Sequence, residues 1–218
     1  PAPPLRTSKI GFPLPMTYTI NSNVWDPNMR VPSKYKIFRQ SPEHIILLSA
    51  FGNEQIRTDN TRDIKGIKYI REAIERLKAE GHLIQAFHAN NIPSQAMKYI
   101  QVQADIIIDQ LNYGSIGANA REGMMLAKPV ICHISQKIKL NNPAMQTCPA
   151  IDATEKTIYV VLKNLILSPK EKLHDMGIKA RTWMLKWYDA DVCAERFEKV
   201  YERLIQNLAP YSPDLIPK

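Results

Sequence analysis

Short apolar segments alternate along this chain with longer amphipathic segments, and this alternation constrains the fold more than any other feature. Segments of strand length occupy residues 44–50, 83–88, 104–109 and 129–134, with a shorter one at 148–151. Segments of helical character occupy residues 66–80, 93–102, 118–126, 154–167, 169–188 and 191–208. Strands that alternate with helices form parallel βαβ units. The sequence therefore predicts an α/β fold, with a Rossmann-like, doubly wound parallel sheet flanked by helices.

The residue patterns inside these segments indicate their type. Residues 44–50, HIILLSA, are a continuous apolar run that suits a strand buried on both faces. Residues 66–80 are amphipathic, and one face collects Ile67, Ile70, Ala73, Ile74 and Leu77. Gly81 follows where a helix commonly ends. The last helix, 191–208, is also amphipathic and carries Val192, Phe197, Val200, Tyr201 and Leu204.

Two further helix starts are predicted from capping residues. Asp152 and Ser168 each stand three positions before a glutamate, which is the pattern of a capping box. The second site also has Pro169, a residue favoured in the first helical position.

Proline marks the boundary of the folded domain. Seven of the 16 prolines fall before Ser33, and proline interrupts both helices and central strands. We expect residues 1–43 to be a proline-rich lead-in with little regular structure beyond a short strand at 16–21 and a short helix near 33–40. Residues 44–209 would form one Rossmann-like domain, and residues 210–218 a tail.

Composition excludes several classes of protein. No run of eighteen apolar residues exists, and the first residues lack the charged and apolar regions of a signal peptide. The cysteines Cys132, Cys148 and Cys193 are odd in number and far apart, which argues against a disulfide framework and a structural zinc. The five histidines never pair at metal-ligand spacing. We expect a cytoplasmic protein.

The net charge of +8 favours an anionic partner, although solvated surface lysines would give the same total. Nucleotide phosphates, nucleic acid and an acidic membrane face all qualify. The positive charge is spread along the chain without a block of five or six Lys and Arg, so we expect no nucleic-acid partner. A peripheral contact with the inner membrane surface stays open.

The first candidate site precedes the helix at 66–80. Arg62 and Lys65 flank the helix start, and Gly66 lets the backbone approach a ligand closely. A helix N-terminus offers unpaired N–H groups and a positive dipole end, so two cations beside it suit a diphosphate. Cations at such positions are also commonly just solvated.

The second candidate site follows the strand at 104–109. The glycine turn at 112–117 leads directly into a helix, and its backbone N–H groups suit phosphate oxygens. Glu122 lies in the first turns of that helix. A carboxylate there can accept two hydrogen bonds from the vicinal diol of a ribose, or serve as an ordinary acid that the helix dipole stabilises.

Residues 104–134, ADIIIDQLNYGSIGANAREGMMLAKPVICHI, resemble the donor-binding segment of GT-B glycosyltransferases of the large retaining family four. That segment runs from an apolar strand through a Gly-x-x-Gly turn to Glu-Ala-Met-Ala-x-Gly-Lys-Pro-Val, where this chain has EGMMLAKPV from Glu122 to Val130. Lys65 and Gly66 are similar to the Lys-Gly that opens the first helix of the same domain. The resemblance covers about residues 44–208 and implies the C-terminal, donor-binding domain of such an enzyme.

The resemblance implies a role for each matching position. Arg62, Lys65 and Gly66 would hold the donor diphosphate and steady the leaving group. Glu122 would bind the ribose. The backbone of the turn would face the phosphates and sugar, through Gly114, Ser115, Ile116 and Gly117. The positions nearest the base, with the least support, would be His88, Ala89, Asn90 and Ile92.

The implied reaction transfers a hexose from a nucleoside-diphosphate sugar, with UDP or GDP as the nucleotide, to an acceptor with retention. The resemblance implies no cofactor and no metal, because fixed cations neutralise the diphosphate. No catalytic residue is assigned, since the histidine that the family places near the reacting sugar belongs to the first domain.

The chain departs from the family pattern at several positions. Many members have a second glutamate eight residues before the position of Glu122, where this chain has Gly114. Ala127 replaces a usual glycine, and Gly123 stands where the family has another small residue. Arg62 lies only three residues before Lys65, so Arg57 is an alternative for its role.

The chain also has no room for the family's first domain, which carries the acceptor site. We therefore expect either a fragment of a longer enzyme or a half that works with an N-terminal acceptor-binding domain or partner chain. Two rival functions stay open: a non-catalytic nucleotide-binding module that acts with a partner, and, on charge alone, a nucleic-acid binder.

Overall fold

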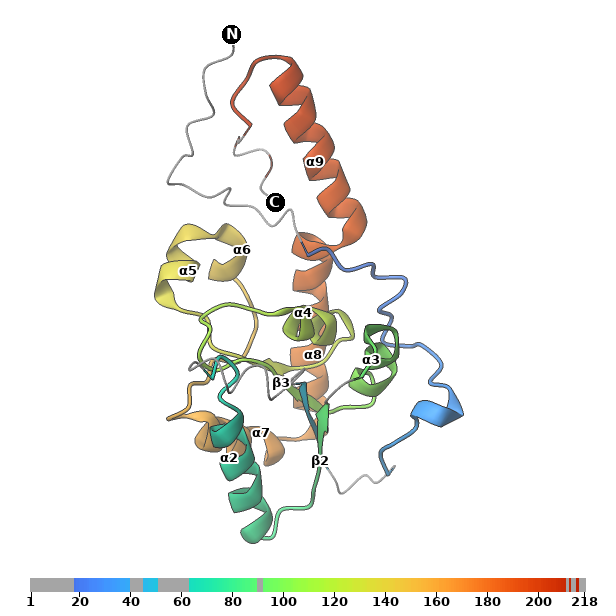
Figure 1. Cartoon of the computed structure of the whole chain (residues 1–218), viewed down its shortest axis with the longest axis vertical. Coiled ribbons are helices and arrows are strands. Elements are labelled where there is room, and N and C mark those ends of the chain that lie inside the picture. The colour runs from blue at the N-terminus through green and yellow to red at the C-terminus, as the bar shows by residue number, and fades with distance from the viewer. Residues whose placement is uncertain are drawn as a thin grey trace.

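The computed structural model describes residues 18–39, 63–89, 92–210, 212 and 215, together with the backbone of 45–50. Its centre is a sheet of four parallel strands in the order β2-β1-β3-β4 (Figure 1). The strands are β1 (Ile45–Ala50), β2 (Ile84–Ala89), β3 (Ile106–Ile108) and β4 (Val130–Ile131). The predicted Rossmann-like parallel sheet with flanking helices is confirmed.

The order of the strands reverses beside β1. The chain passes from β1 to β2 on one side, then returns to place β3 on the other side of β1. Such a reversal opens a crevice beyond the carboxyl ends of the two central strands, where open α/β sheets bind their ligands. The segments that follow β1 and β3 are therefore the expected place for a ligand.

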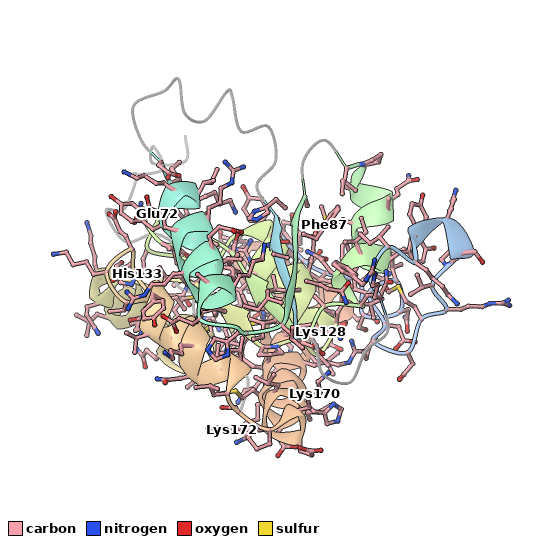
Figure 2. The ribbon with its side chains drawn as sticks, turned by 90° about the horizontal axis from the view of Figure 1, so that it is seen from below. Glu72, Phe87, Lys128, His133, Lys170 and Lys172 are labelled. Carbon is pink, nitrogen blue, oxygen red and sulfur yellow. The ribbon has the colours of Figure 1, made fainter. Side chains whose placement is uncertain are left out.

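Helices cover both faces of the sheet. One face is covered by α2 (Ile67–Ala79) and α7 (Ile158–Ile166), which lie side by side (Figure 2). The other face is covered by α3 (Ser94–Gln101), α4 (Ala118–Met125) and most of α8 (Lys170–Tyr188). Alternate residues of β3 serve the two layers, because Ile106 and Ile108 pack with α2 while Ile107 packs with α4.

The first long helix ends as the sequence predicts. Gly81 has φ of +89°, its N–H donates to the carbonyl of Lys78, and the N–H of His82 donates to the carbonyl of Leu77. This pair of bonds is a Schellman motif, which satisfies carbonyls at the end of a helix. The predicted apolar face of α2 is buried throughout.

The stretch after β4 differs from the sequence-based expectation. The predicted strand at 129–134 is ordered as a strand only at Val130 and Ile131, and the predicted strand near 148–151 is a single bridge between Ile131 and Ile151. Two short helices that the sequence did not predict follow, α5 (Gln136–Asn141) and α6 (Pro143–Gln146). The side chains of Ser135 and Asn142 cap these helices, so each of the two polar residues marks a helix start.

Neither predicted capping box forms, although the helix predicted at 169–188 is present as α8, from Lys170 to Tyr188. Helix α7 begins at Ile158, because the carboxylate of Asp152 instead contacts His133 at 3.0 Å and accepts from the N–H of Ile134. The hydroxyl of Ser168 donates to a carbonyl at the end of α7 and leaves the start of α8 without a side-chain cap. Asp152 therefore has a partner from a distant segment, whereas Ser168 bonds a carbonyl four residues earlier.

The last helix, α9 (Ala190–Ile205), projects beyond the sheet at the end of the molecule away from α2 (Figure 1). Its N-terminus is capped by Asp189. Of the apolar face predicted for it, Val200 is buried whereas Tyr201 and Leu204 are exposed. None of the helices in the described ranges has the length and apolar character that crossing a bilayer requires.

Residues 18–39 of the lead-in pack against the domain. The N–H of Ile20 donates to the carbonyl of Tyr188 at 2.9 Å, and the Arg181 guanidinium donates to the carbonyl of Trp25 at 3.0 Å. The strand predicted at 16–21 is represented by one bridge at Ile20, while Met16 and Thr17 lie outside the described residues. The predicted helix near 33–40 is one 3₁₀ turn, η1 (Ser33–Tyr35).

Helix α8 crosses the end of α4 at very short range. Ala127, which replaces a usual family glycine, has φ of +55°, a left-handed conformation that glycine adopts more easily. A Cβ built on Gly177 would lie 1.9 Å from the carbonyl oxygen of Ala127. One turn further along α8, Arg181 also donates to the carbonyl of Met125. The contact therefore requires a glycine at position 177.

We expect Gly177→Ala to destabilise the protein by about 2 kcal/mol or more, because the backbone of Ala127 cannot yield to a methyl group. In an ordinary helix interior the same change would stabilise. Urea unfolding measures the difference, with Gly81→Ala as the control, since a Cβ there meets no atom within 4 Å and only the positive φ is strained. A Gly177→Ala protein as stable as the wild type would contradict this packing.

Candidate functional site

The segments that follow β1 and β3 are joined beyond the carboxyl ends of the strands. The N–H of Leu111 donates to the carbonyl of Lys65 at 3.3 Å, and the N–H of Asn112 donates to the carbonyl of Ile64 at 3.1 Å. The Asn112 side-chain amide adds a bond of 2.7 Å to the carbonyl of Asp63. These bonds place the start of α2 against the segment that leads into α4, so the two candidate sites of the sequence form one.

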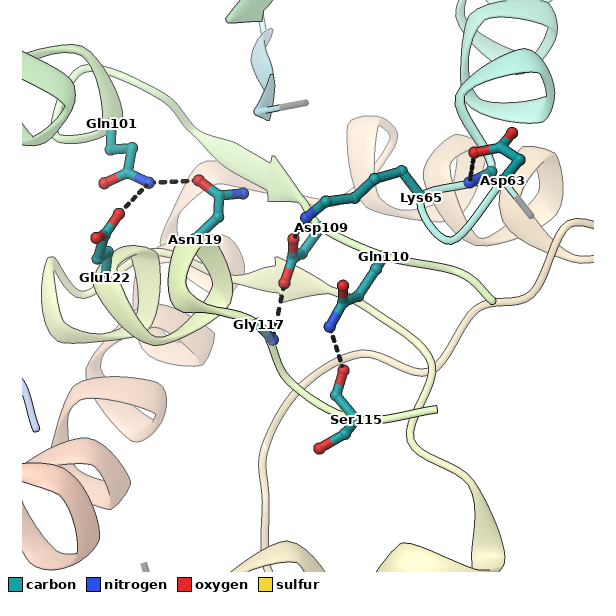
Figure 3. A network of polar contacts seen from close by, with 10 residues as sticks. Asp63, Lys65, Gln101, Asp109, Gln110, Ser115, Gly117, Asn119 and Glu122 are labelled. Atoms are coloured by element: carbon teal, nitrogen blue, oxygen red, sulfur yellow. Dashed lines mark hydrogen bonds and ion pairs between the residues drawn. The ribbon is translucent and has the colours of Figure 1, made fainter. Parts of the chain in front are cut away.

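A buried ion pair lies at the centre of this site (Figure 3). The ammonium of Lys65 bonds one carboxylate oxygen of Asp109, and the two side chains are 8% and 0% exposed. The other oxygen of Asp109 accepts from the N–H of Gly117 at 3.0 Å. One carboxylate thus engages both a predicted cation and the N-terminus of α4.

Asp109 is the functional residue that the sequence reasoning missed. A signal was present, because an acid at the carboxyl end of a buried strand needs a partner to remain charged. Its position after the run Ile106–Ile108 made it a candidate partner for Lys65, since both residues follow adjacent central strands.

The backbone conformation and close packing at position 66 favour a glycine. Gly66 has φ of +68°, and a Cβ there would lie 3.1 Å from the side chain of Leu111. Its N–H donates to the carboxylate of Asp63 at 2.8 Å. The backbone N–H of Gly66, predicted to face a diphosphate, therefore already has an acceptor within this chain.

The glycine turn before α4 is held by internal contacts. The carbonyl of Gly114 accepts from Ser135, and the carbonyl of Ser115 accepts from the side chain of Gln110 at 2.8 Å. Ile116 is buried in the core. A Cβ on Gly117 would lie 2.7 Å from the nearest oxygen of Asp109, so in this structure the glycine admits the carboxylate.

Glu122 points from α4 toward α3. The side-chain amide of Gln101 donates to Glu122 at 3.3 Å and to Asn119 (Figure 3). Burial raises the pKa of the Glu122 carboxyl to about 7, while the Gln101 hydrogen bond lowers it and nearby Asp109 raises it. A pKa near 7 would let this carboxyl change its protonation state within the neutral pH range.

A pocket of about 670 Å³ opens beside Glu122. Its walls come from the lead-in, from α3 and from Glu122 itself, with both apolar and cationic side chains. The lining residues besides Glu122 are Thr19, Ile20, Val24, Trp25, Pro32, Lys34, Tyr35, Ser94, Gln95, Lys98 and Tyr99. The rings of Tyr35 and Tyr99 stack with centroids 5.1 Å apart, which joins the lead-in to α3.

A second pocket of about 740 Å³ lies beside the joined segments. Asp63, Leu111 and Asn112 contribute to it, together with His133 after β4. The described residues contain no group of three or more His, Cys, Asp or Glu side chains that could hold a metal ion.

The other predicted site residues either lie outside the described residues or do not line the pocket beside Glu122. Arg62, its alternative Arg57, and Asn90 lie outside the described residues. Ala89 is buried at the end of β2, and Ile92 is partly buried against the core. Neither they nor His88 belong to the lining of the pocket beside Glu122.

We expect the effects of substituting Lys65 and Asp109 on the free energy of unfolding to depend strongly on each other. Lys65→Met leaves a fully buried carboxylate without its cation, and we expect it to cost about 3 kcal/mol. Asp109→Asn should cost less, since the amide keeps an acceptor. The double variant should lose at least about 1 kcal/mol less stability than the sum of the two single losses. Urea unfolding of all four proteins gives the coupling, and the exposed pair Lys78–Glu75 is the control; additive losses would contradict the pair.

Comparison with known proteins supports the fold. No protein-family model matches the chain, and no curated protein matches it by sequence. Among solved structures it is similar to sucrose-phosphate synthase from Thermosynechococcus elongatus, with a TM-score of 0.57, 13% identity, and coverage of 87% of this chain and 52% of that one.

Two further solved structures match over a similar extent. A glycosyltransferase from Rickettsia africae ESF-5 has a TM-score of 0.54, 17% identity and coverage of 87% and 56%. The catalytic domain of starch synthase IV from Arabidopsis thaliana, bound to ADP and acarbose, has a TM-score of 0.54, 11% identity and coverage of 86% and 48%. This chain spans about half the length of these structures. It has the α/β fold of a GT-B glycosyltransferase domain.

Proposed function

We propose that this chain is the C-terminal, donor-binding domain of a glycosyltransferase of the retaining family-four type. It binds a nucleoside-diphosphate sugar, whose sugar is transferred to an acceptor with retention. The observation that carries the proposal is the partly buried carboxyl of Glu122, which lines a large pocket beside the switch point of a GT-B-type sheet.

Glu122 suits the ribose of the donor. A carboxylate can accept hydrogen bonds from two neighbouring hydroxyls, and desolvation strengthens such bonds. The pocket beside it falls within the range of about 300–1,000 Å³ that small-molecule sites occupy. The aromatic rings of Trp25 and Tyr99 line the same pocket and offer apolar surface for a nucleobase.

The diphosphate would lie between Glu122 and the start of α2. In this proposal Arg62, Lys65 and Gly66 face it from one side, and the turn from Gly114 to Gly117 faces it from the other. Positive charge there would stabilise the leaving nucleotide as the glycosidic bond breaks, without a metal ion.

In this proposal the acceptor-binding site lies outside this chain. The solved structures that it resembles are about twice as long, and the proposal assigns the acceptor site and catalytic groups to a first domain or a partner chain. The net charge of +8 is consistent with a cytoplasmic protein that meets an acidic membrane surface peripherally.

A non-catalytic nucleotide-binding module is the second candidate. The structure favours it at one point, since the ammonium of Lys65 and the N–H groups of Gly66 and Gly117 are all engaged by carboxylates of this chain. Such a module would bind a nucleotide but transfer no sugar when a candidate acceptor domain is added. Observed transfer would exclude it.

Calorimetric titration with UDP, GDP and ADP, each beside a matching nucleotide sugar, tests the proposal. We expect one nucleotide to bind, and Glu122→Gln to weaken it roughly tenfold or more through loss of a charged acceptor. Glu198→Gln, an exposed change on α9, is the matched control and should bind as the wild type does. Equal affinities of the Glu122→Gln and wild-type proteins would refute the ribose role.

Binding should also depend on pH through Glu122. The pKa near 7 means that raising the pH from 6 to 8 ionises this carboxyl and creates the stronger acceptor. Affinity for the nucleotide sugar should therefore rise about fivefold or more over this range. Its diphosphate keeps the same charge throughout, and Glu122→Gln should abolish the rise; a rise that persists in that variant would assign it to another group.

A further inference from the structure

Asp109 makes the two contacts that the proposed function would give to a phosphoryl group of the donor. One oxygen meets the Lys65 ammonium, and the other accepts from the backbone N–H of Gly117 at the start of α4. We propose that Asp109 is a built-in counter-anion that occupies the phosphate position, so that a donor phosphate must displace it from Lys65. This inference rests on the proposed function and specifies how its diphosphate subsite is controlled.

The fit of the carboxylate shows that the position is built for an anion. Asp109 is fully buried, and the absence of a side chain on Gly117 makes room for its oxygen. The Gln110 amide closes the same corner, since a Cβ on Gly117 would lie 3.1 Å from its nitrogen. Two charge-assisted bonds therefore hold the carboxylate in place.

The charges around this position oppose a second anion. Asp63 accepts from the Gly66 N–H, and the charge of Asp109 raises the pKa of the Glu122 carboxyl. The charge of Lys65 is thus balanced by Asp109 as long as the pair is closed. In this proposal a phosphoryl group gains the uncompensated charge of Lys65 only after Asp109 has moved away, so the closed pair weakens phosphate binding.

Inorganic pyrophosphate separates this inference from nucleoside recognition. Because Asp109→Asn removes the competing charge and keeps a polar side chain, calorimetry should show pyrophosphate binding that variant roughly tenfold or more tightly than the wild type. Lys65→Met in the Asp109→Asn background should remove the gain. Asp175→Asn, an exposed change on α8, removes the same charge and should leave pyrophosphate affinity unaltered.

Thermal unfolding of each variant confirms that it is folded, and Asp109→Ser replaces Asp109→Asn if the amide is not tolerated. Pyrophosphate affinity that is unchanged or weaker in the folded variant would overturn the counter-anion role. The proposed function is judged separately, by nucleotide binding that depends on Glu122. A nucleotide that binds through Glu122 with the same affinity in Asp109→Asn would leave that function standing and overturn only this inference.

Discussion

The buried pair between Lys65 and Asp109 is the interaction on which the rest of the site depends. Taking two charges out of water costs several kcal/mol for each, and only close pairing with further hydrogen bonds offsets that cost. Asp109 meets the condition because its second oxygen accepts from Gly117. The pair thereby joins the segment after β1, the end of β3 and the start of α4 at the point where the strand order reverses. Gly66 and Gly117 lie next to these segments. A Cβ on Gly117 would collide with the Asp109 carboxylate, and a Cβ on Gly66 would crowd the side chain of Leu111.

The pocket beside Glu122 depends on a different set of contacts, which bring distant parts of the chain together. Ile20 bonds the junction of α8 and α9, and Arg181 holds the carbonyl of Trp25 against the end of α4. Stacking of Tyr35 on Tyr99 then fixes the lead-in over α3. The lead-in is therefore a wall of the proposed nucleoside site, in which burial raises the pKa of the Glu122 carboxyl.

These two features divide the proposed donor site into unequal parts. The nucleoside half would consist of the pocket of about 670 Å³ and the Glu122 carboxyl. The phosphate half has a cation and helix N–H groups that are already satisfied by carboxylates. A ligand that binds this domain would gain its first contacts from the nucleoside and would compete with Asp109 for the rest. Such a division would make donor engagement responsive to whatever moves the Lys65–Asp109 pair, including a first domain that closes over the same edge of the sheet.

The sequence by itself determined the parallel sheet, the long helices and the candidate segments at the ends of β1 and β3, because hydrophobic periodicity and glycine turns are local signals. It also singled out Glu122 and Lys65. The capping boxes expected at Asp152 and Ser168 do not form, because Asp152 contacts His133, 19 residues away, and Ser168 donates to a carbonyl of the preceding helix. Only the tertiary structure decided that Asp109 takes Lys65 and Gly117, and that the lead-in forms a pocket wall. Burial and pairing of charges depend on which residues meet across the fold, and no local pattern specifies such meetings.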